Sequence, residues 1–289
     1  MNWLEDANVA FRTSLDDLRS MSADDFPQDQ PVRVDVETPV VTIPLLVVKR
    51  EHADKLTVLN NGAVDLKRSQ GKPIFQRSSW WQEINSHQIY VCDPGTVGEK
   101  SLALNWFQSS PPEWPNQLVT IALRLISGHL GIRDASRRTY YGSSAGGFTA
   151  LLQLCADKNA KCVINNAQFD WTRWYAHHVN PVLKKHFNGS FAADVRQRWP
   201  HRANALAYLS KNAKPLNIAY YVNMASSYDR DIQLPIFEKY LSEYPTLCGS
   251  IFIHRHFDEP RGHNPLGKEA TLRILNEVMV ENTFDDFKK

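Results

Sequence analysis

The chain is poor in several features that would place it in a specialised class of protein. Its 289 residues include four cysteines, none of them in a CxxC pair, so we expect buried, reduced thiols rather than a disulfide framework or a cysteine metal site. Thirteen glycines and 16 prolines are too few for a fibrous or disordered chain. This composition predicts a globular protein.

Long hydrophobic runs are also missing. The best apolar stretch, Val40–Val48, has the length of a strand and contains Pro44, whereas a membrane-spanning helix needs about 20 apolar residues. The first residues, Met1–Asp6, lack the basic and apolar regions of a secretory signal. Together these absences predict a soluble, cytoplasmic protein without a membrane span.

An excess of charge of one sign is absent as well. The formal net charge of +2 is too small to favour nucleic acid or an anionic membrane as a partner. The distribution is less even, because residues 170–214 carry eight Lys and Arg against two Asp. This basic stretch is a candidate for contact with an anion.

Strand-length apolar segments alternate with helix-length segments over most of the chain, which predicts an α/β fold with a mostly parallel sheet covered by helices. Ligand sites in such sheets lie at the carboxyl ends of the strands. Residues 1–30 have apolar residues at loose helical spacing and predict an N-terminal helical appendage, followed by one domain over residues 31–289. That domain opens with two antiparallel strands, 32–36 and 40–48. The further strands are expected at 55–59, 88–92, 138–141, 161–166, 216–222 and 249–253, and the helices at 117–130, 145–156, 234–241 and 266–280.

The segment Gly142-Ser143-Ser144-Ala145-Gly146 has the GxSxG pattern of a nucleophile elbow. A predicted strand precedes it and a predicted helix follows, and the glycines suit a sharp turn at which backbones approach closely. The pattern predicts Ser144 as a nucleophile. A phosphate-binding turn is a poor alternative, because the lysine of a P-loop is absent.

A serine nucleophile needs a histidine base and a carboxylate that orients it, in the chain order serine, acid, histidine. His263, between the last strand and the last helix, is the predicted base. Asp229 is our first choice for the acid and Asp231 the second, since both follow the strand 216–222 and either could instead cap the next helix. His254, His256 and Asp258 lie nearby, but no HExxH or CxxC spacing accompanies them, so no metal site is expected.

The tetrahedral intermediate of acyl transfer needs backbone N–H donors. The residue after the nucleophile, Ala145, is the first predicted donor, and Gly62 or Ala63 in the loop after the strand 55–59 is the second. The loop that contains them, Asn60-Asn61-Gly62-Ala63, is also compatible with an ordinary Asn-Gly turn.

Four segments of the chain carry a resemblance to a known family. They are the elbow with its following Gly147, the segment Val163-Ile164-Asn165-Asn166-Ala167-Gln168, the loop Val58–Ala63, and Gly262-His263. These segments resemble α/β-hydrolase-fold enzymes of bacterial polysaccharide biosynthesis, in particular capsular polysaccharide O-acetyltransferases. In outline the resemblance covers residues 55–280. It departs from the family at the acid, because the positions that would align are Ala225 or Ser226, which cannot serve.

The resemblance implies an α/β-hydrolase fold and transfer of an acetyl group to a saccharide hydroxyl through an acyl-Ser144 intermediate. Acetyl-CoA is a possible donor, and no bound cofactor is implied. With water as the acceptor the same residues give a carboxylesterase or deacetylase, and a non-catalytic binding module with this fold is the third reading.

The long connection of about residues 170–213 reads as a cap-like helical insertion over the site. Its basic residues, Arg173 among them, could bind CoA or a phosphosugar, and Trp171, Trp174 and Tyr175 could stack on sugar rings. Solvated helix faces and core aromatics explain the same residues equally well. Asn61 and Gln168, beside the oxyanion loop and the elbow, complete the predicted substrate contacts.

Overall fold

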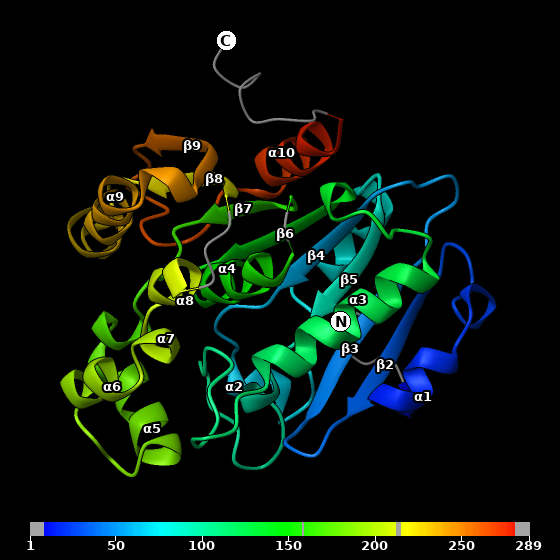
Figure 1. Ribbon diagram of the computed structural model, residues 1–289, viewed down its shortest axis with the longest axis horizontal. Helices are drawn as coiled ribbons and strands as arrows, with labels where there is room; N and C mark the ends of the chain where they lie inside the picture. The colour runs from blue at the N-terminus through cyan, green and yellow to red at the C-terminus, as the bar shows by residue number, and fades with distance from the viewer. Residues whose placement is uncertain (1–8, 158, 212–214, 281–289) are drawn as a thin grey trace.

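In the computed structural model, which describes residues 9–157, 159–211 and 215–280, nine strands form one sheet in the order β1-β2-β3-β5-β4-β6-β7-β8-β9 (Figure 1). β3 is antiparallel to both of its neighbours, and all other neighbouring pairs are parallel. The strands are β1 (Val9–Ser14), β2 (Pro31–Glu37), β3 (Thr42–Val48), β4 (Leu56–Asn60), β5 (His87–Val91), β6 (Arg138–Ser143), β7 (Lys161–Asn165), β8 (Leu216–Asn223) and β9 (Cys248–His256). The mostly parallel sheet and the antiparallel opening confirm the predicted fold class.

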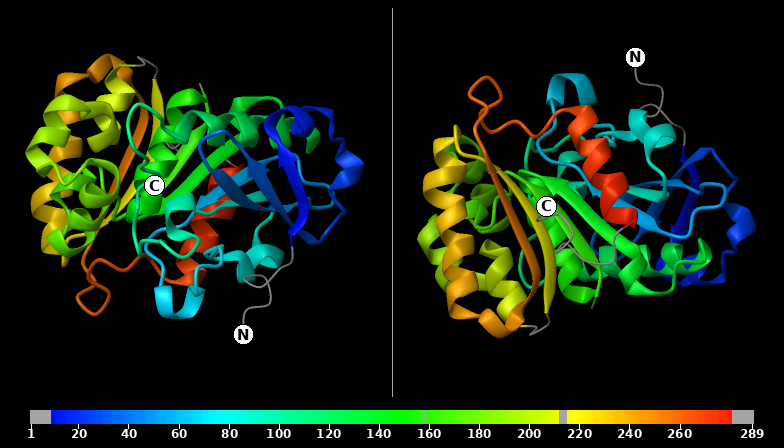
Figure 2. Two further views of the ribbon diagram at one scale, coloured as in Figure 1. Left: turned by 90° about the horizontal axis from the view of Figure 1, so that it is seen from below. Right: turned by 90° about the horizontal axis from the view of Figure 1, so that it is seen from above.

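Helices cover both faces of this sheet (Figure 2). They are α1 (Leu15–Ser20), α2 (Leu66–Ser69), α3 (Asn116–His129), α4 (Ala145–Ala156), α5 (Ala176–His186), α6 (Ala192–Arg198), α7 (Pro200–Ala203), α8 (Ala205–Lys211), α9 (Leu234–Glu243) and α10 (Lys268–Val280). The predicted helices at 117–130, 145–156, 234–241 and 266–280 correspond to α3, α4, α9 and α10. None of the helices within the described ranges is long and apolar enough to cross a bilayer.

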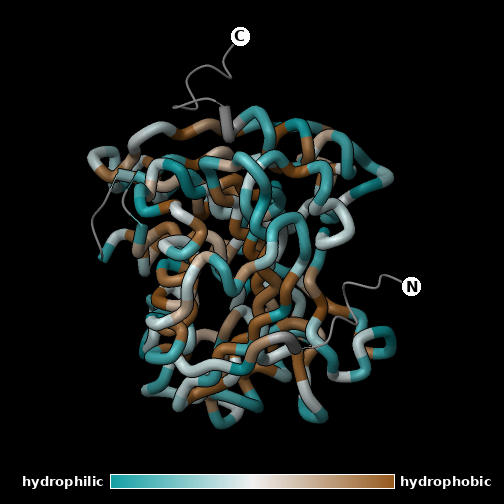
Figure 3. The backbone as a smooth tube through the Cα atoms, turned by 90° about the vertical axis from the view of Figure 1, so that its right-hand side faces the viewer, coloured by the Kyte–Doolittle hydropathy of each residue, from teal (hydrophilic) through white to brown (hydrophobic). Residues whose placement is uncertain are grey.

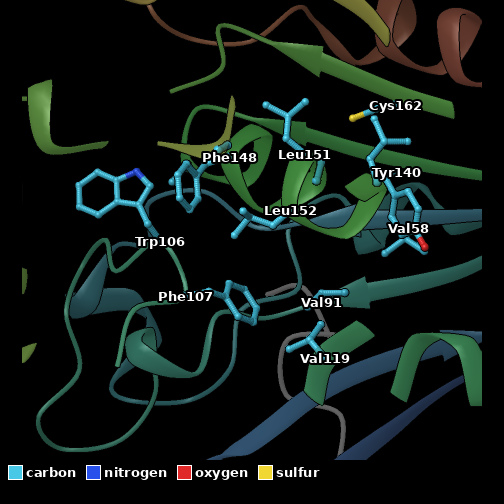
Figure 4. Packing of buried hydrophobic residues seen from close by; sticks show 14 of the residues in the cluster. Val58, Val91, Trp106, Phe107, Val119, Tyr140, Phe148, Leu151, Leu152 and Cys162 are labelled. Atoms are coloured by element: carbon cyan, nitrogen blue, oxygen red, sulfur yellow. The ribbon is translucent and has the colours of Figure 1, made fainter. Parts of the chain in front are cut away.

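Successive side chains of a strand point to opposite faces, and two separate cores result. On β6, Tyr140 packs in the core that contains α3 and α4, whereas Tyr141 packs in the core that contains Leu272 and Leu275 of α10. Figure 4 shows Leu151 and Leu152 of α4 near residues of the central strands, and Figure 3 shows hydrophobic stretches running through the middle of the molecule. The elbow therefore joins a strand and a helix that are both buried.

The N-terminal prediction is partly wrong. Residues 9–14 form β1, which pairs in parallel with β2, for example Phe11 with Val34 and Thr13 with Val36. Only α1 in this region is an α-helix, and residues 1–8 lie outside the described residues. Pairing with the free edge of β2 decides the conformation here, which loose helical spacing of apolar residues could not reveal. This segment extends the central sheet and is not a helical appendage.

Four helices, α5 to α8, occupy the connection between β7 and β8, as the sequence predicts. Figure 1 shows α5, α6 and α7 gathered at one end of the molecule. α8 packs against α4. Since α4 follows Ser144 directly, the insertion is anchored on the helix that carries the elbow.

Candidate active site

Ser144 lies between the end of β6 and the start of α4, with φ 55° and ψ −124°. This backbone conformation is rare for a residue with a side chain and is the strained turn expected of a nucleophile elbow. Glycines make the turn possible, because a Cβ on Gly142 would lie 2.0 Å from the Gly146 carbonyl oxygen. A Cβ on Gly146 would lie 2.7 Å from the carbonyl oxygen of Asn60. The predicted elbow geometry is therefore present.

His263 reaches Ser144 from the loop between β9 and α10. Its Nε2 lies 2.9 Å from Ser144 Oγ, and its Nδ1 lies 2.7 Å from Asp229 Oδ2. Gly262, with φ 50°, supplies the turn before it. A carboxylate at Nδ1 favours the tautomer with the proton on that nitrogen, which leaves Nε2 free to accept from the serine hydroxyl.

The two candidate acids have different environments. Asp229 starts a short π-helical segment, Asp229–Gln233, and is fully buried. Asp231 is about half exposed and forms an ion pair with the neighbouring Arg230 at 2.6 Å. The structure thus brings Asp229 to the histidine, and it does so six residues after β8 ends at Asn223.

The predicted backbone N–H donors for the tetrahedral intermediate come from the start of α4 and from the loop after β4. Ala145 is the first residue of α4, so its N–H has no acceptor within the helix. The N–H of Gly62 donates to Gln76 Oε1 at 2.9 Å, and Gln76 Nε2 donates to the Ala63 carbonyl oxygen at 2.7 Å. Of the two predicted second donors, Gly62 is therefore already engaged, and Ala63 remains the predicted partner of Ala145.

Three buried asparagines hold the His263 loop against the sheet. Asn166 Nδ2 donates to the His263 carbonyl oxygen at 2.9 Å, and its Oδ1 accepts from the Asn223 N–H at 2.8 Å. Asn223 Nδ2 donates to the carbonyl oxygens of Asp258 and Gly262, and Asn165 Oδ1 accepts from the Leu266 N–H. Our sequence reasoning assigned no role to these side chains. Their position in the sequence could have indicated a role, since each stands at or just after the carboxyl end of a strand, where sites in parallel sheets lie.

A cavity of about 530 Å³ opens over Ser144 and His263. Its walls come from the oxyanion loop, the segment around Arg77 and Trp80, and the loop from Arg261 to Lys268. Beside His263, Trp174 of the insertion packs on the imidazole with ring centroids 4.4 Å apart, and Tyr228 adjoins Trp174. The site thus has tryptophans on two sides, Trp80 in the cavity wall and Trp174 against the imidazole.

Most of the predicted substrate contacts lie elsewhere. Trp171 is fully buried and donates to the Arg202 carbonyl oxygen, so it is a core residue and the prediction of sugar stacking is wrong for it. Gln168 is also fully buried, with its Oε1 accepting from the Trp106 indole, while Asn61 Oδ1 accepts from the Asp93 N–H. Arg173 pairs with Asp170 and lines a separate cavity of about 320 Å³ between the insertion and α9.

The predictions that Asn61 and Gln168 contact the substrate fail for the same reason. Asn61 and Gln168 are neighbours of the site along the chain, but their side chains point inward and satisfy buried backbone and indole groups. The Gln168 backbone N–H does contribute, because it donates to the Ser144 carbonyl oxygen at 3.1 Å. Gln168 therefore supports the elbow through its backbone and not through its side chain.

His254 and His256 stack on each other on β9, with ring centroids 5.9 Å apart. Across residues 9–157, 159–211 and 215–280, no group of three or more His, Cys, Asp or Glu side chains is arranged to hold a metal ion. What the described side chains do form is a chain of hydrogen bonds from Ser144 through His263 to Asp229. Such an arrangement can raise the nucleophilicity of a serine hydroxyl.

No protein-family model and no curated protein sequence matches the chain. Solved structures do resemble it. Porphyromonas gingivalis dipeptidyl peptidase 4 aligns with a TM-score of 0.61 at 13% identity, over 89% of this chain and 36% of that one, so the chain spans about a third of that protein's length. The capsule O-acetyltransferase of Neisseria meningitidis serogroup A aligns with a TM-score of 0.59 at 14% identity, over 86% of this chain and 94% of that one.

A third similar structure is the fluorophosphonate-binding serine hydrolase F of Staphylococcus aureus, with a TM-score of 0.54 at 10% identity, over 88% of this chain and 99% of that one. At these identities the similarity concerns the fold. The sheet order, the elbow and these neighbours together define the class: the chain has the α/β-hydrolase fold.

Proposed function

We propose that the chain is a serine-dependent acyltransferase that moves an acetyl group onto a saccharide hydroxyl through an acyl-Ser144 intermediate. The observation that carries the proposal is the pair of hydrogen bonds that connects Ser144 Oγ, His263 and the buried Asp229. In this arrangement Ser144 is the nucleophile, His263 the general base and Asp229 the group that orients it.

In the first half-reaction Ser144 Oγ attacks the carbonyl carbon of the acyl donor while His263 Nε2 takes the hydroxyl proton. The N–H groups of Ala145 and Ala63 donate to the negatively charged oxygen of the tetrahedral intermediate. The intermediate collapses as the bond to the leaving group breaks, and His263 returns the proton to that group. If acetyl-CoA is the donor, CoA leaves as the free thiol and Ser144 carries the acetyl group.

In the second half-reaction an acceptor hydroxyl replaces the leaving group. His263 takes its proton, the acceptor oxygen attacks the acyl carbon, and the Ser144–acyl bond breaks as the proton returns to Ser144 Oγ. The acceptor leaves as an ester and the enzyme is regenerated, so that neither half-reaction needs an oxidant or a metal.

Three observations support a saccharide acceptor and an acetyl donor. The Neisseria capsule O-acetyltransferase has a similar length and fold, and a variant of it has been crystallised in complex with CoA. Tyr175 is 42% exposed and packs on Trp174, next to His263, which offers an aromatic surface of the kind on which sugar rings stack. None of the four cysteines, all of which lie in the described ranges, forms a disulfide, which suits the reducing cytoplasm, where acetyl-CoA is available.

Hydrolysis is the second candidate. The His263 side chain is 27% exposed, so water has access to the base, and an acyl-enzyme attacked by water is an esterase or deacetylase. The two activities share every catalytic residue and differ in how well acceptor binding outcompetes water.

A fluorophosphonate probe tests the shared first step. We expect the wild type to be labelled on Ser144, and the Ser144→Ala and His263→Ala variants to resist labelling. An unlabelled wild type, or equal labelling of Ser144→Ala, would favour a non-catalytic binding module with this fold.

Incubation with acetyl-CoA and a panel of sugars separates transferase from esterase. We expect acetylated sugar to form at the expense of free acetate when a suitable acceptor is added. Acetate release that no acceptor alters would support the esterase.

A further inference from the structure

Arg77 lies in the wall of the Ser144 cavity, and its backbone is held in an unusual conformation. It precedes the 3₁₀ helix Ser78–Glu83 and has φ 69° and ψ 5°, in the left-handed region that few residues other than glycine adopt. A residue with a side chain keeps this strained backbone conformation only where the surrounding structure holds it. Sequence reasoning singled out neither Arg77 nor its neighbours.

The Arg77 guanidinium lies beside the elbow, within cation–π distance of two aromatic rings. It lies over the Tyr141 ring, with Cζ 4.9 Å from the centroid, and 5.8 Å from the centroid of Trp80. One Nη donates to Ser143 Oγ at 2.8 Å, and Ser143 immediately precedes the nucleophile. The cation–π contacts use none of the five N–H donors of the guanidinium, and the hydrogen bond to Ser143 uses one.

The cavity has an unbalanced charge. Its titratable lining residues besides His263 are Arg77, Arg261 and Lys268, with no Asp or Glu among the described residues that line it. Arg261 pairs with Asp258 at 3.2 Å and Lys268 with Glu83 at 2.5 Å, both outside the lining. For Arg77, no carboxylate lies within ion-pair distance in the ranges that the structure describes. Arg77 is partly buried and faces the cavity, so an anionic ligand there would accept charge-assisted hydrogen bonds from it.

We infer that Arg77 binds an anionic group of the substrate, a carboxylate or a phosphate, close to the ester on which Ser144 acts. The inference rests on the proposed acyl transfer through Ser144. It narrows the reactants to an acidic sugar, bound as the acceptor and as the acylated product, or to an acyl group that itself carries a carboxylate. A guanidinium with free donors suits such a group because it can donate two parallel hydrogen bonds to two oxygens.

The position of Arg77 limits where that anion sits in the substrate. A guanidinium that is hydrogen-bonded to Ser143 reaches groups next to the reacting carbonyl. The phosphates of acetyl-CoA are too far away, because the whole pantetheine arm separates them from the thioester. The anion therefore belongs to the acyl group or to the sugar, and the CoA phosphates need a different contact.

Binding measured without turnover tests this inference independently of catalysis. Calorimetry on the full chain carrying Ser144→Ala would compare O-acetyl glucuronate with O-acetyl glucose for an anion on the sugar, and O-succinyl glucose with O-butyryl glucose for an anion on the acyl group. O-acetyl glucose 6-phosphate adds a phosphate. We expect at least one anionic probe to bind roughly 10- to 100-fold more tightly than its neutral counterpart, the range of one charge-assisted hydrogen-bonded pair.

Adding Arg77→Gln should abolish this preference, and Arg77→Lys should keep part of it, because lysine preserves the charge without the planar fork. Arg19→Gln is the matched control, since it removes a cation that is 60% exposed and paired with Asp16, and it should leave the preference intact. Equal affinity for anionic and neutral probes, or a preference that survives Arg77→Gln, would overturn the inference. Because Ser144 is already replaced, either result is distinct from a failure of fluorophosphonate labelling in the wild type.

Discussion

At the scale of single residues, the site distinguishes two aspartates that are two positions apart in the chain. Asp229 is fully buried and contacts the imidazole, whereas Asp231 is exposed and contacts a neighbouring arginine. Burial matters because a carboxylate shielded from water holds the imidazole in one tautomer and stabilises its protonated form more strongly. The proposed acid is therefore Asp229 alone.

Replacing Asp229 with asparagine should lower kcat by about 10³- to 10⁴-fold, because an amide stabilises the wrong tautomer of His263. Asp231→Asn, which removes the same charge two residues away, should change kcat by less than about twofold, the scale of an exposed pair. Steady-state turnover of an activated acyl ester by both variants measures the difference. Equal losses would mean that Asp229 does not orient the base.

The residues whose place beside one another could be predicted from sequence are the ones fixed by local chain geometry. Ser144 stands in a strand-turn-helix pattern, and His263 stands between the last strand and the last helix. Whether Asn61 or Gln168 faces a substrate depends instead on partners far away in the sequence, such as Trp106 for Gln168. No local pattern encodes such pairings.

At the scale of elements, the geometry of the site depends on how the β9–α10 loop is attached to the sheet. Asn223 ends β8, and its Nδ2 donates to two carbonyl oxygens of this loop, that of Asp258 at 2.7 Å and that of Gly262 at 2.8 Å. Its own Oδ1 accepts from the N–H groups of Ala225 and Asp258. The Asn223 side chain therefore makes four of the hydrogen bonds at this strand end, three of them to the segment that precedes His263.

Asn223→Ala should lower kcat/KM by about 10²-fold although Ser144, His263 and Asp229 all remain, because the freed loop would displace the imidazole by a fraction of an ångström to an ångström. Asn217→Ala, at the opposite end of the same strand, is the control and should retain activity. Ester hydrolysis and thermal unfolding of both variants give the comparison. An Asn223→Ala enzyme as active as the Asn217→Ala enzyme would contradict the positioning role.

Element positions in the central sheet follow from hydrophobic pattern, because those strands are buried on both faces and read as continuous apolar runs. β1 was not predictable in this way. It is an edge strand whose conformation is determined by pairing with β2, and its apolar spacing is equally compatible with a helix.

At the scale of the whole molecule, a buried ion pair fastens the strand before the elbow to the helix after it. Arg138, the first residue of β6, donates to Asp157 through Nε and Nη2 at 2.5 and 2.9 Å. Tyr140 also donates to Asp157 at 2.5 Å, and both charged side chains are less than a tenth exposed. The pair lies at the end of α4 away from Ser144.

Asp157→Ala should lower the free energy of unfolding by about 3–5 kcal/mol, because it leaves the Arg138 charge buried without its anion. Asp16→Ala, whose carboxylate is 95% exposed in its pair with Arg19, should have no measurable effect. Urea unfolding at neutral pH measures both. A small effect of Asp157→Ala would show that the buried pair is not needed for stability.

A second stability effect depends on pH. Burial, with the charges of Lys185 and Arg202, lowers the pKa of His186 from 6.5 to about 4, while its Nε2–H donates to Asn105 Oδ1 at 2.8 Å. Between pH 6.5 and 4 the unfolded chain binds a proton at this histidine that the folded chain does not, so folding stability falls as the pH falls through that window.

His186→Gln removes the titrating group, and it should lose less stability than the wild type between pH 7 and pH 5. His52→Gln, at a side chain that is 90% exposed, should follow the wild type. Urea unfolding at the two pH values tests this. Identical losses in the wild type and His186→Gln would rule out His186 as a source of acid sensitivity.

The central claim is that Ser144 carries an acyl group during the reaction. The most direct measurement is mass spectrometry of the protein after brief mixing with acetyl-CoA and rapid acid quenching, followed by peptide mapping. Our account predicts a mass increase of one acetyl group on the peptide that contains Ser144, which disappears when an acceptor sugar is added and is absent in Ser144→Ala. Product formation without such an adduct, or an adduct on another residue, would contradict it.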